Sequence, residues 1–199
     1  MLYAAAALVA AFELAVLWQA LHPSVPADYR AYFLDQTTTC LNEPEPGTYA
    51  FGTEIATVSG SEKLVKPLNI CGWEGPVGDG LHAVGESSRL RFALPADAHD
   101  LKLMLQMVAV DMAKDKGEAV TVVVNGQTLR TVQVATGTPQ RFDFAVPQAA
   151  IAGSKALDVE LHFPEAITID PQDSNTRKRS IKLSAVQVAE QSQMGGAAS

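Results

Sequence analysis

Residues 120–134 read VTVVVNGQTLRTVQV, and this stretch decides the fold. Its two arms are rich in β-branched residues, and the pair Asn125-Gly126 lies between them. An Asn-Gly pair between two such runs is the strongest short signal for a β-hairpin, because both turn positions need a positive φ. The stretch therefore predicts two antiparallel strands joined by a tight turn.

The same alternation of apolar and polar residues recurs on both sides of this hairpin. It is found in residues 89–94, 101–107, 142–146, 157–163 and 181–185. A period of two is the pattern of a strand in a sheet with one buried face. Short strands at fairly even spacing, with almost no helical period between them, predict a mainly β protein. We expect an antiparallel β-sandwich with a jelly-roll or galactose-binding-like topology.

The N-terminal residues differ from this pattern. Residues 2–21 form a nearly uninterrupted apolar run, with Tyr3 and Trp18 near its ends and Pro23 just after it. About 20 apolar residues suffice to span a bilayer as a helix. Two alternatives are a cleaved signal peptide and an Ala-rich helix packed within a soluble protein. We favour a retained, single transmembrane helix in front of the sandwich.

Glu13 lies near the middle of this run. An ionisable group within a membrane is costly and usually faces a protein partner. Glu13 is therefore predicted to contact an integral-membrane partner.

The chain has two cysteines, Cys40 and Cys71. In an oxidising compartment such a pair commonly forms a disulfide, whereas in the cytosol both would remain thiols. We favour the disulfide. The sequence then predicts a single-pass protein of the inner (cytoplasmic) membrane, with its β-domain facing the periplasm.

These observations predict the domain organisation. Residues 1–23 form the transmembrane anchor, 24–60 a juxtamembrane segment and linker, 61–190 the β-sandwich domain, and 191–199 a disordered tail. Within the linker, residues 37–60 are expected to contribute edge strands rather than a separate domain.

Charge and motifs restrict the function. The formal charge of −7 argues against nucleic acid as a partner. No motif of a nucleophile, a metalloprotease or a phosphate-binding loop is present. Asp111, Asp115 and Glu118 could supply oxygens to a cation, but the interleaved Lys114 and Lys116 favour a charged loop. We expect no enzyme activity, no cofactor and no metal.

Residues 71–82 read CGWEGPVGDGLH and hold the densest group of candidate ligand-binding side chains. An aromatic face stacks on the C–H groups of a sugar while polar groups meet its hydroxyls. Trp73, Glu74, Asp79 and His82 are therefore the predicted ligand-binding residues. In the alternative, Trp73 closes one end of the sandwich and the glycines only serve tight turns.

A family resemblance rests on residues 72–80 (GWEGPVGDG) and 86–95 (ESSRLRFALP), with the hairpin at 124–126 and the strand at 179–183. Together they resemble a bacterial extracytoplasmic β-sandwich domain of unknown function. That domain accompanies membrane-embedded sugar or phosphoglycerol transferases of cell-surface glycan synthesis. The resemblance implies an accessory subunit that assists synthesis or export of envelope polysaccharide. Its expected partners are a glycosyltransferase or polymer exporter and a glycan.

Two other functions stay open. The sandwich could be a protein-docking module in a structural subunit of another membrane complex. A glycan hydrolase is disfavoured, because the sequence assigns no pair of carboxylates flanking a cleft.

Overall fold

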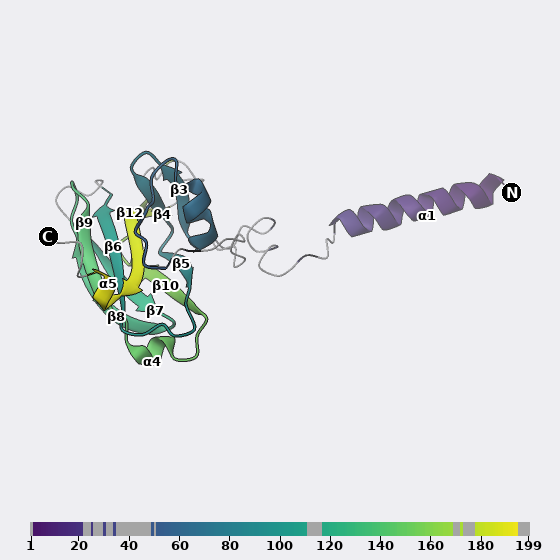
Figure 1. Ribbon diagram of the computed structural model, residues 1–199. Helices are drawn as coiled ribbons and strands as arrows, with labels where there is room; N and C mark the ends of the chain where they lie inside the picture. Colours follow the sequence, from purple (N-terminus) through teal and green to yellow (C-terminus); the bar gives the residue numbers. More distant parts are fainter. Residues whose placement is uncertain are drawn as a thin grey trace. The chain divides into compact units, whose positions relative to one another are not determined.

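The computed structural model describes residues 2–21, the single positions 25, 30, 34, 49 and 172, and the stretches 51–110, 117–168 and 178–194 (Figure 1). The chain divides into two compact units, Met1–Thr38 and Thr39–Ser199. We describe each unit by itself.

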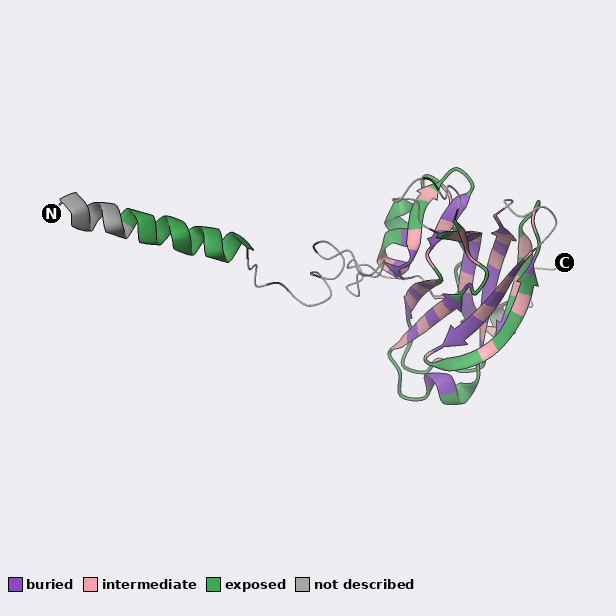
Figure 2. Cartoon of the chain, turned by 180° about the vertical axis from the view of Figure 1, so that it is seen from behind, coloured by how far each residue is buried: buried purple, intermediate pink, exposed green. Residues whose placement is uncertain are grey.

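The first unit contains the helix α1 (Leu2–Leu21). Its described side chains, at residues 9–21, are all exposed, Glu13 among them (Figure 2). In the part of the chain that the structure describes, no helix has both the length and the apolar character required to cross a membrane. The predicted single-pass location in the inner membrane is therefore corrected.

The second unit contains two antiparallel sheets. In the described residues, the larger sheet has seven strands in the order β3-β4-β12-β6-β9, with β1 and β11 also paired to β12. Its strands are β1 (Ile55–Ala56), β3 (Trp73–Val77), β4 (Gly80–Val84), β6 (Leu101–Ala109), β9 (Gln140–Ala145), β11 (Ile167–Thr168) and β12 (Lys178–Glu190). The smaller sheet has five strands in the order β2-β5-β10-β7-β8. Its strands are β2 (Asn69–Cys71), β5 (Ser87–Ala93), β7 (Glu118–Val124), β8 (Gln127–Val134) and β10 (Ala156–His162).

Three short helical turns of the described residues lie between strands, and a fourth, α5, follows β12. They are α3 (Glu62–Val65), η2 (Lys66–Leu68), α4 (Gln148–Ile151) and α5 (Gln191–Met194).

The core is formed by alternate residues of both sheets. Along β10, Leu157, Val159 and Leu161 are fully buried while the residues between them are partly exposed. Phe92 of β5 and Leu103 of β6 are also fully buried and belong to the same cluster. Figure 2 shows the resulting bands of buried and partly buried residues along the strands. The predicted antiparallel β-sandwich is confirmed, whereas the finer topological class stays a prediction.

The hairpin predicted from residues 120–134 is present. Strands β7 and β8 pair with Val124 opposite Gln127, and both turn residues have positive φ, 45° at Asn125 and 79° at Gly126. The Asn125 side chain donates to Ala150 O over 2.8 Å and accepts from Asp158 N over 2.8 Å. Asn125 therefore serves the turn and also ties it to β10.

The sheet begins earlier in the sequence than residue 61. Strand β1 pairs with β12, placing Ile55 opposite Val186. The hydroxyl of Tyr49 donates to Val188 O over 3.0 Å and accepts from Val188 N over 2.9 Å. Part of the expected linker 24–60 thus belongs to the sandwich. At the other end, α5 lies within the expected tail 191–199.

Cys71 is disulfide-bonded. Cys40 lies outside the described residues, so the pairing of Cys40 with Cys71 stays a prediction.

Candidate ligand-binding site

Three of the four predicted ligand-binding residues lie together on the β3–β4 hairpin. Glu74 is opposite His82 in the β3–β4 ladder, and His82 is opposite Lys182 in the β4–β12 ladder. Residues directly opposite one another share a face of the sheet. Asp79, in the turn between β3 and β4, lies 2.8 Å from His82 Nε2 through its Oδ1 and also bonds Lys182.

Trp73 does not join this group. Adjacent residues of a strand point to opposite faces, so Trp73 and Glu74 face apart. The Trp73 ring is half-buried against the core, and its Nε1 donates to Arg89 O over 3.2 Å. These contacts favour the alternative in which Trp73 closes the sandwich. Ligand binding by Trp73, Glu74, Asp79 and His82 stays a prediction.

The acidic side chains of this hairpin form ion pairs with basic side chains of β12. Glu74 forms an ion pair with Arg179 of β12. The hydrogen bond from Lys182, with a second from His82, lowers the pKa of Asp79 to about 2. The side chains of Glu74 and Asp79 are more than half exposed, at 60% and 54%. The hairpin therefore presents solvated ion pairs.

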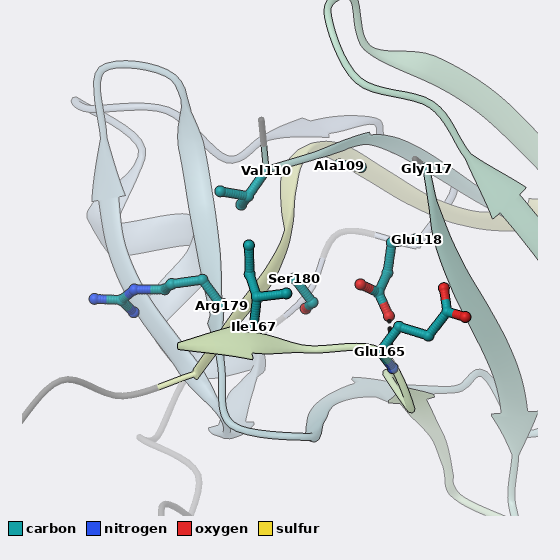
Figure 3. A pocket seen from close by; sticks show the side chains of 8 residues that line it. All are labelled: Ala109, Val110, Gly117, Glu118, Glu165, Ile167, Arg179 and Ser180. Carbon is teal, nitrogen blue, oxygen red and sulfur yellow. Dashed lines mark hydrogen bonds between the residues drawn. The ribbon is translucent and has the colours of Figure 1, made fainter. Parts of the chain in front are cut away.

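A pocket of about 260 Å³ lies where β6 ends and β7 begins, next to β11 and β12 (Figure 3). We call it the Glu118 pocket; its lining residues are Ala109, Val110, Gly117, Glu118, Glu165, Ile167, Arg179 and Ser180. Val110 and Ile167 supply an apolar wall, while Glu118 and Ser180 supply polar groups. The pocket draws on both sheets, since β7 belongs to the smaller and β12 to the larger.

Glu118 occupies a core-facing position. It precedes Val120 and Val122 in the alternation of β7, and it is only 6% exposed. Its Oε1 accepts a hydrogen bond from Glu165 N over 3.2 Å. Burial is the main cause that raises the pKa of Glu118, and the negative charge of Glu165 adds to it. The protonated form of Glu118 is thus favoured more than in an ordinary glutamate.

Ser180 provides the second polar group of the pocket. The residue is 3% exposed, and its Oγ has no hydrogen-bond partner among the described residues. Figure 3 shows Ser180 between Ile167 and Glu118, whereas the guanidinium of Arg179 points away from Glu118. The Arg179 charge is paired with Glu74, as described above.

Sequence reasoning treated Glu118 only as a member of a charged loop. The sequence contained a local signal for the burial of Glu118, because Glu118 occupies the same set of alternate strand positions as Val120, Val122 and Val124, which are buried. A charged residue on the core face of a strand is rare unless it serves a site or a partner. Asp111 and Asp115 lie outside the described residues. Within the described stretches, no three His, Cys, Asp or Glu residues are grouped as metal ligands would be.

A second hollow, of about 460 Å³, lies beside β10 and β7. It is lined by Glu86, Ser87, Thr121, His162, Phe163 and Pro164. His162 is exposed, and its Nε2 lies 3.5 Å from Glu160 Oε2. None of the buried, unpartnered side-chain atoms found in the described residues belongs to this hollow. The Glu118 pocket is therefore the stronger candidate for a ligand site.

The sequence matches no protein-family model and no curated protein. Among solved structures it is similar to a carbohydrate-binding module, CBM36, in complex with calcium and xylotriose. That match has a TM-score of 0.39 and 10% identity and covers 69% of this chain and 99% of the module.

Two further similar structures are a domain of a xylanase and part of a larger protein. The CBM36-1 domain of a multidomain xylanase from the hindgut metagenome of Trinervitermes trinervoides has a TM-score of 0.35 and 12% identity, covering 66% of this chain and 94% of the domain. Latent PorU from Porphyromonas gingivalis has a TM-score of 0.43 and 10% identity, covering 74% of this chain and 13% of PorU. At these TM-scores the likenesses carry no functional argument, and the sandwich assignment rests on the strand pairing.

Proposed function

We propose that the β-sandwich is a non-catalytic glycan-binding domain whose ligand occupies the Glu118 pocket. The observation that carries the proposal is the buried Ser180 hydroxyl, which lines the pocket and has no hydrogen-bond partner among the described residues. Buried polar groups in folded proteins are nearly always hydrogen-bonded. Leaving one unpaired costs about 1–3 kcal/mol, and a ligand hydroxyl would relieve that cost.

The wall of the pocket supports a sugar as the ligand. A sugar ring presents C–H groups and hydroxyls together, so its site combines apolar surface with a few placed polar groups. Val110 and Ile167 supply the apolar surface, and Glu118 and Ser180 supply the polar groups. The volume of about 260 Å³ lies just below the about 300–1,000 Å³ of sites for drug-sized ligands. We therefore expect the pocket to hold a single sugar unit, such as the end of a chain.

A matched pair of serine variants tests this proposal. We would screen the full-length protein against a glycan array and measure affinities for the strongest hits by titration calorimetry. Ser180→Ala should weaken binding roughly ten-fold, which corresponds to about 1.4 kcal/mol. Ser184→Ala is the control, because Ser184 lies on the same strand and its Oγ donates instead to Gln106 O over 3.1 Å. The proposal fails if no glycan binds, or if both variants bind as the wild type does.

A second candidate function, glycan hydrolysis, is favoured by one observation. Two carboxylates, Glu118 and Glu165, line the same pocket, and the pKa of Glu118 is raised. Glycoside hydrolases use such a pair, with one member kept protonated as the acid. In Figure 3, however, the Glu165 carboxylate points away from Ser180, whereas that of Glu118 points toward it. We therefore prefer binding, and release of new reducing ends from the bound glycan would decide for hydrolysis.

A role as an accessory subunit of polysaccharide synthesis is a further proposal. Its support is the sequence resemblance of residues 72–80 and 86–95. Co-purification of the full-length protein with a sugar transferase or polymer exporter encoded beside it would test this role. Recovery with an unrelated complex would favour the protein-docking alternative.

A further inference from the structure

We infer that the Glu118 pocket selects sugars that carry a protonated amine over sugars that carry a carboxylate. This inference rests on the proposed glycan-binding function and names the chemical class of its ligand. It starts from the charges that face the pocket.

Among the described residues, three ionisable side chains line the pocket: Glu118, Glu165 and Arg179. The Arg179 guanidinium is turned away from Glu118, and its Nη2 is paired with Glu74, whereas its Nη1 has no hydrogen-bond partner among the described residues (Figure 3). Arg179 therefore forms no ion pair with either glutamate of the pocket. The described carboxylates of the pocket therefore present negative charge to a ligand when Glu118 is ionised.

The polar atoms suit an ammonium group. A protonated amine donates up to three hydrogen bonds and accepts none. Both the Glu118 carboxylate and the unpartnered Ser180 Oγ are acceptors for such donors. A carboxylate on the ligand would instead meet the like charge of Glu118, whereas the Arg179 guanidinium that could attract it points away from Glu118 (Figure 3). Like charges placed close together in a partly buried site repel strongly.

A metal ion is the competing cation. Calcium takes about 6–8 oxygen ligands, and the pocket offers two carboxylates and one serine hydroxyl among its described side chains. Val110 and Ile167 add apolar side chains to the described wall. An amine attached to a sugar ring uses both the acceptors and this apolar surface, so it fits better than a bare ion.

Burial of Glu118 connects this selectivity to pH. An ammonium ligand binds best when Glu118 is ionised, so its affinity should fall as Glu118 takes up a proton. The other described ionisable side chains that line the pocket are Glu165 and Arg179. A neutral sugar needs no ionised Glu118 and should show little of this dependence.

Three tetrasaccharides with the same β-1,4 linkage give a matched set of probes. They are tetramers of glucose, glucosamine and N-acetylglucosamine, which differ only at C2. Titration calorimetry of the full-length protein, at about pH 6.5 and about 0.15 M salt, should show the glucosamine tetramer binding at least roughly ten-fold more tightly than the glucose tetramer. An oligosaccharide that contains glucuronic acid should bind more weakly than the glucose tetramer.

Two variants separate the pocket from general attraction to a protein of charge −7. Glu118→Gln should bring the ratio between the glucosamine and glucose tetramers close to one. Glu74→Gln removes a carboxylate outside the pocket and should leave that ratio high. Added EDTA should not alter the ratio, and a preference that required calcium would overturn the inference in favour of a metal site.

The outcomes distinguish a failure of this inference from a failure of the proposed glycan-binding function. Equal binding of the three tetrasaccharides, or a preference that survives Glu118→Gln, overturns the inference and leaves glycan binding intact. Binding of no oligosaccharide at all overturns the proposed function itself.

Discussion

The indole Nε1 of Trp73 donates a hydrogen bond to the carbonyl oxygen of Arg89 over 3.2 Å. This bond connects the two sheets of the sandwich, because Trp73 begins β3 of the larger sheet and Arg89 lies in β5 of the smaller one. The Trp73 ring also packs against the core. Trp73 therefore contributes to the stability of the sandwich.

Replacing Trp73 should show this contribution directly. Trp73→Ala removes the ring and the bond, and we expect a loss of about 3 kcal/mol in the free energy of unfolding. Trp73→Phe keeps most of the ring and should lose only about 1 kcal/mol. Urea denaturation of both variants measures the difference. An unchanged unfolding curve for Trp73→Ala, together with lost glycan binding, would restore the sequence-based prediction of a stacking face.

The low pKa of Asp79 makes a second prediction. The hydrogen bond from Lys182 is its largest cause, ahead of the bond from His82. Lys182→Met should therefore raise the pKa from about 2 toward the ordinary value of about 3.9, and His82→Gln should raise it less. Titration of the Asp79 carboxyl carbon by NMR measures both. If the pKa of Asp79 stays low in Lys182→Met, a group other than Lys182 stabilises the Asp79 carboxylate.

The same shift sets the direction of a pH effect on stability. A carboxyl whose pKa is depressed in the folded state stabilises the protein above its unfolded pKa, and this contribution is lost as the pH falls. For Asp79 the loss runs from about pH 4 downward through the folded value of about 2. Because Asp79 is exposed, solvent screening keeps the contribution small.

Glu118 should affect the pH dependence of stability in the direction opposite to that of Asp79. Its pKa is raised in the folded state, chiefly by burial. Its contribution to stability is therefore greatest below the ordinary glutamate pKa of about 4.3, and it declines as the pH rises through the raised value. Glu118→Gln has no charge to desolvate and retains an acceptor for Glu165 N.

Urea denaturation near pH 4 and near pH 7 tests whether the contribution of Glu118 to stability declines as the pH rises. Relative to the wild type, Glu118→Gln should gain stability between the lower and the higher pH. If the two proteins change in parallel, Glu118 does not titrate abnormally in the folded state.

Gly72 is a position where only glycine fits. It has φ +74°, and an added Cβ would lie 2.2 Å from Ser87 O. Gly72→Ala should therefore destabilise the domain by about 2 kcal/mol or more, as expected for a strained backbone and a clash. Gly78→Ala is the matched control, because no atom lies within 4 Å of its added Cβ. Equal thermal melts of the two variants would show that the backbone at Gly72 relaxes.

Much of the fold could be predicted because its signals are local. Alternation over residues 89–94 and 101–107 corresponds to β5 and β6, and Asn125-Gly126 forms the hairpin between β7 and β8. Edge strands are expected within residues 37–60, but no alternation of apolar and polar residues locates β1 among them. Tyr49 joins the sandwich through hydrogen bonds with Val188 of β12 and a ring contact with Phe92 of β5, both distant in sequence.

The Glu118 pocket could not be predicted as a whole. Glu118, Glu165 and Ser180 come from β7, the segment before β11, and β12. These residues come together only because of which strands lie side by side. Alternation in the sequence identifies a strand but does not show which strands are its neighbours. The residues predicted instead, Glu74, Asp79 and His82, are close in sequence, and the structure gathers them into solvated ion pairs.

The most direct test of the account is to locate the bound sugar. Backbone amide resonances of the isotope-labelled full-length protein would be followed by NMR while each of the three tetrasaccharides is added. Binding in the Glu118 pocket predicts that the amides of Val110, Glu118, Ile167 and Ser180 shift together and saturate, while that of His82 does not move. Shifts confined to the β3–β4 hairpin around His82, or no saturable shift with any of the sugars, would contradict the claim that this pocket binds glycan.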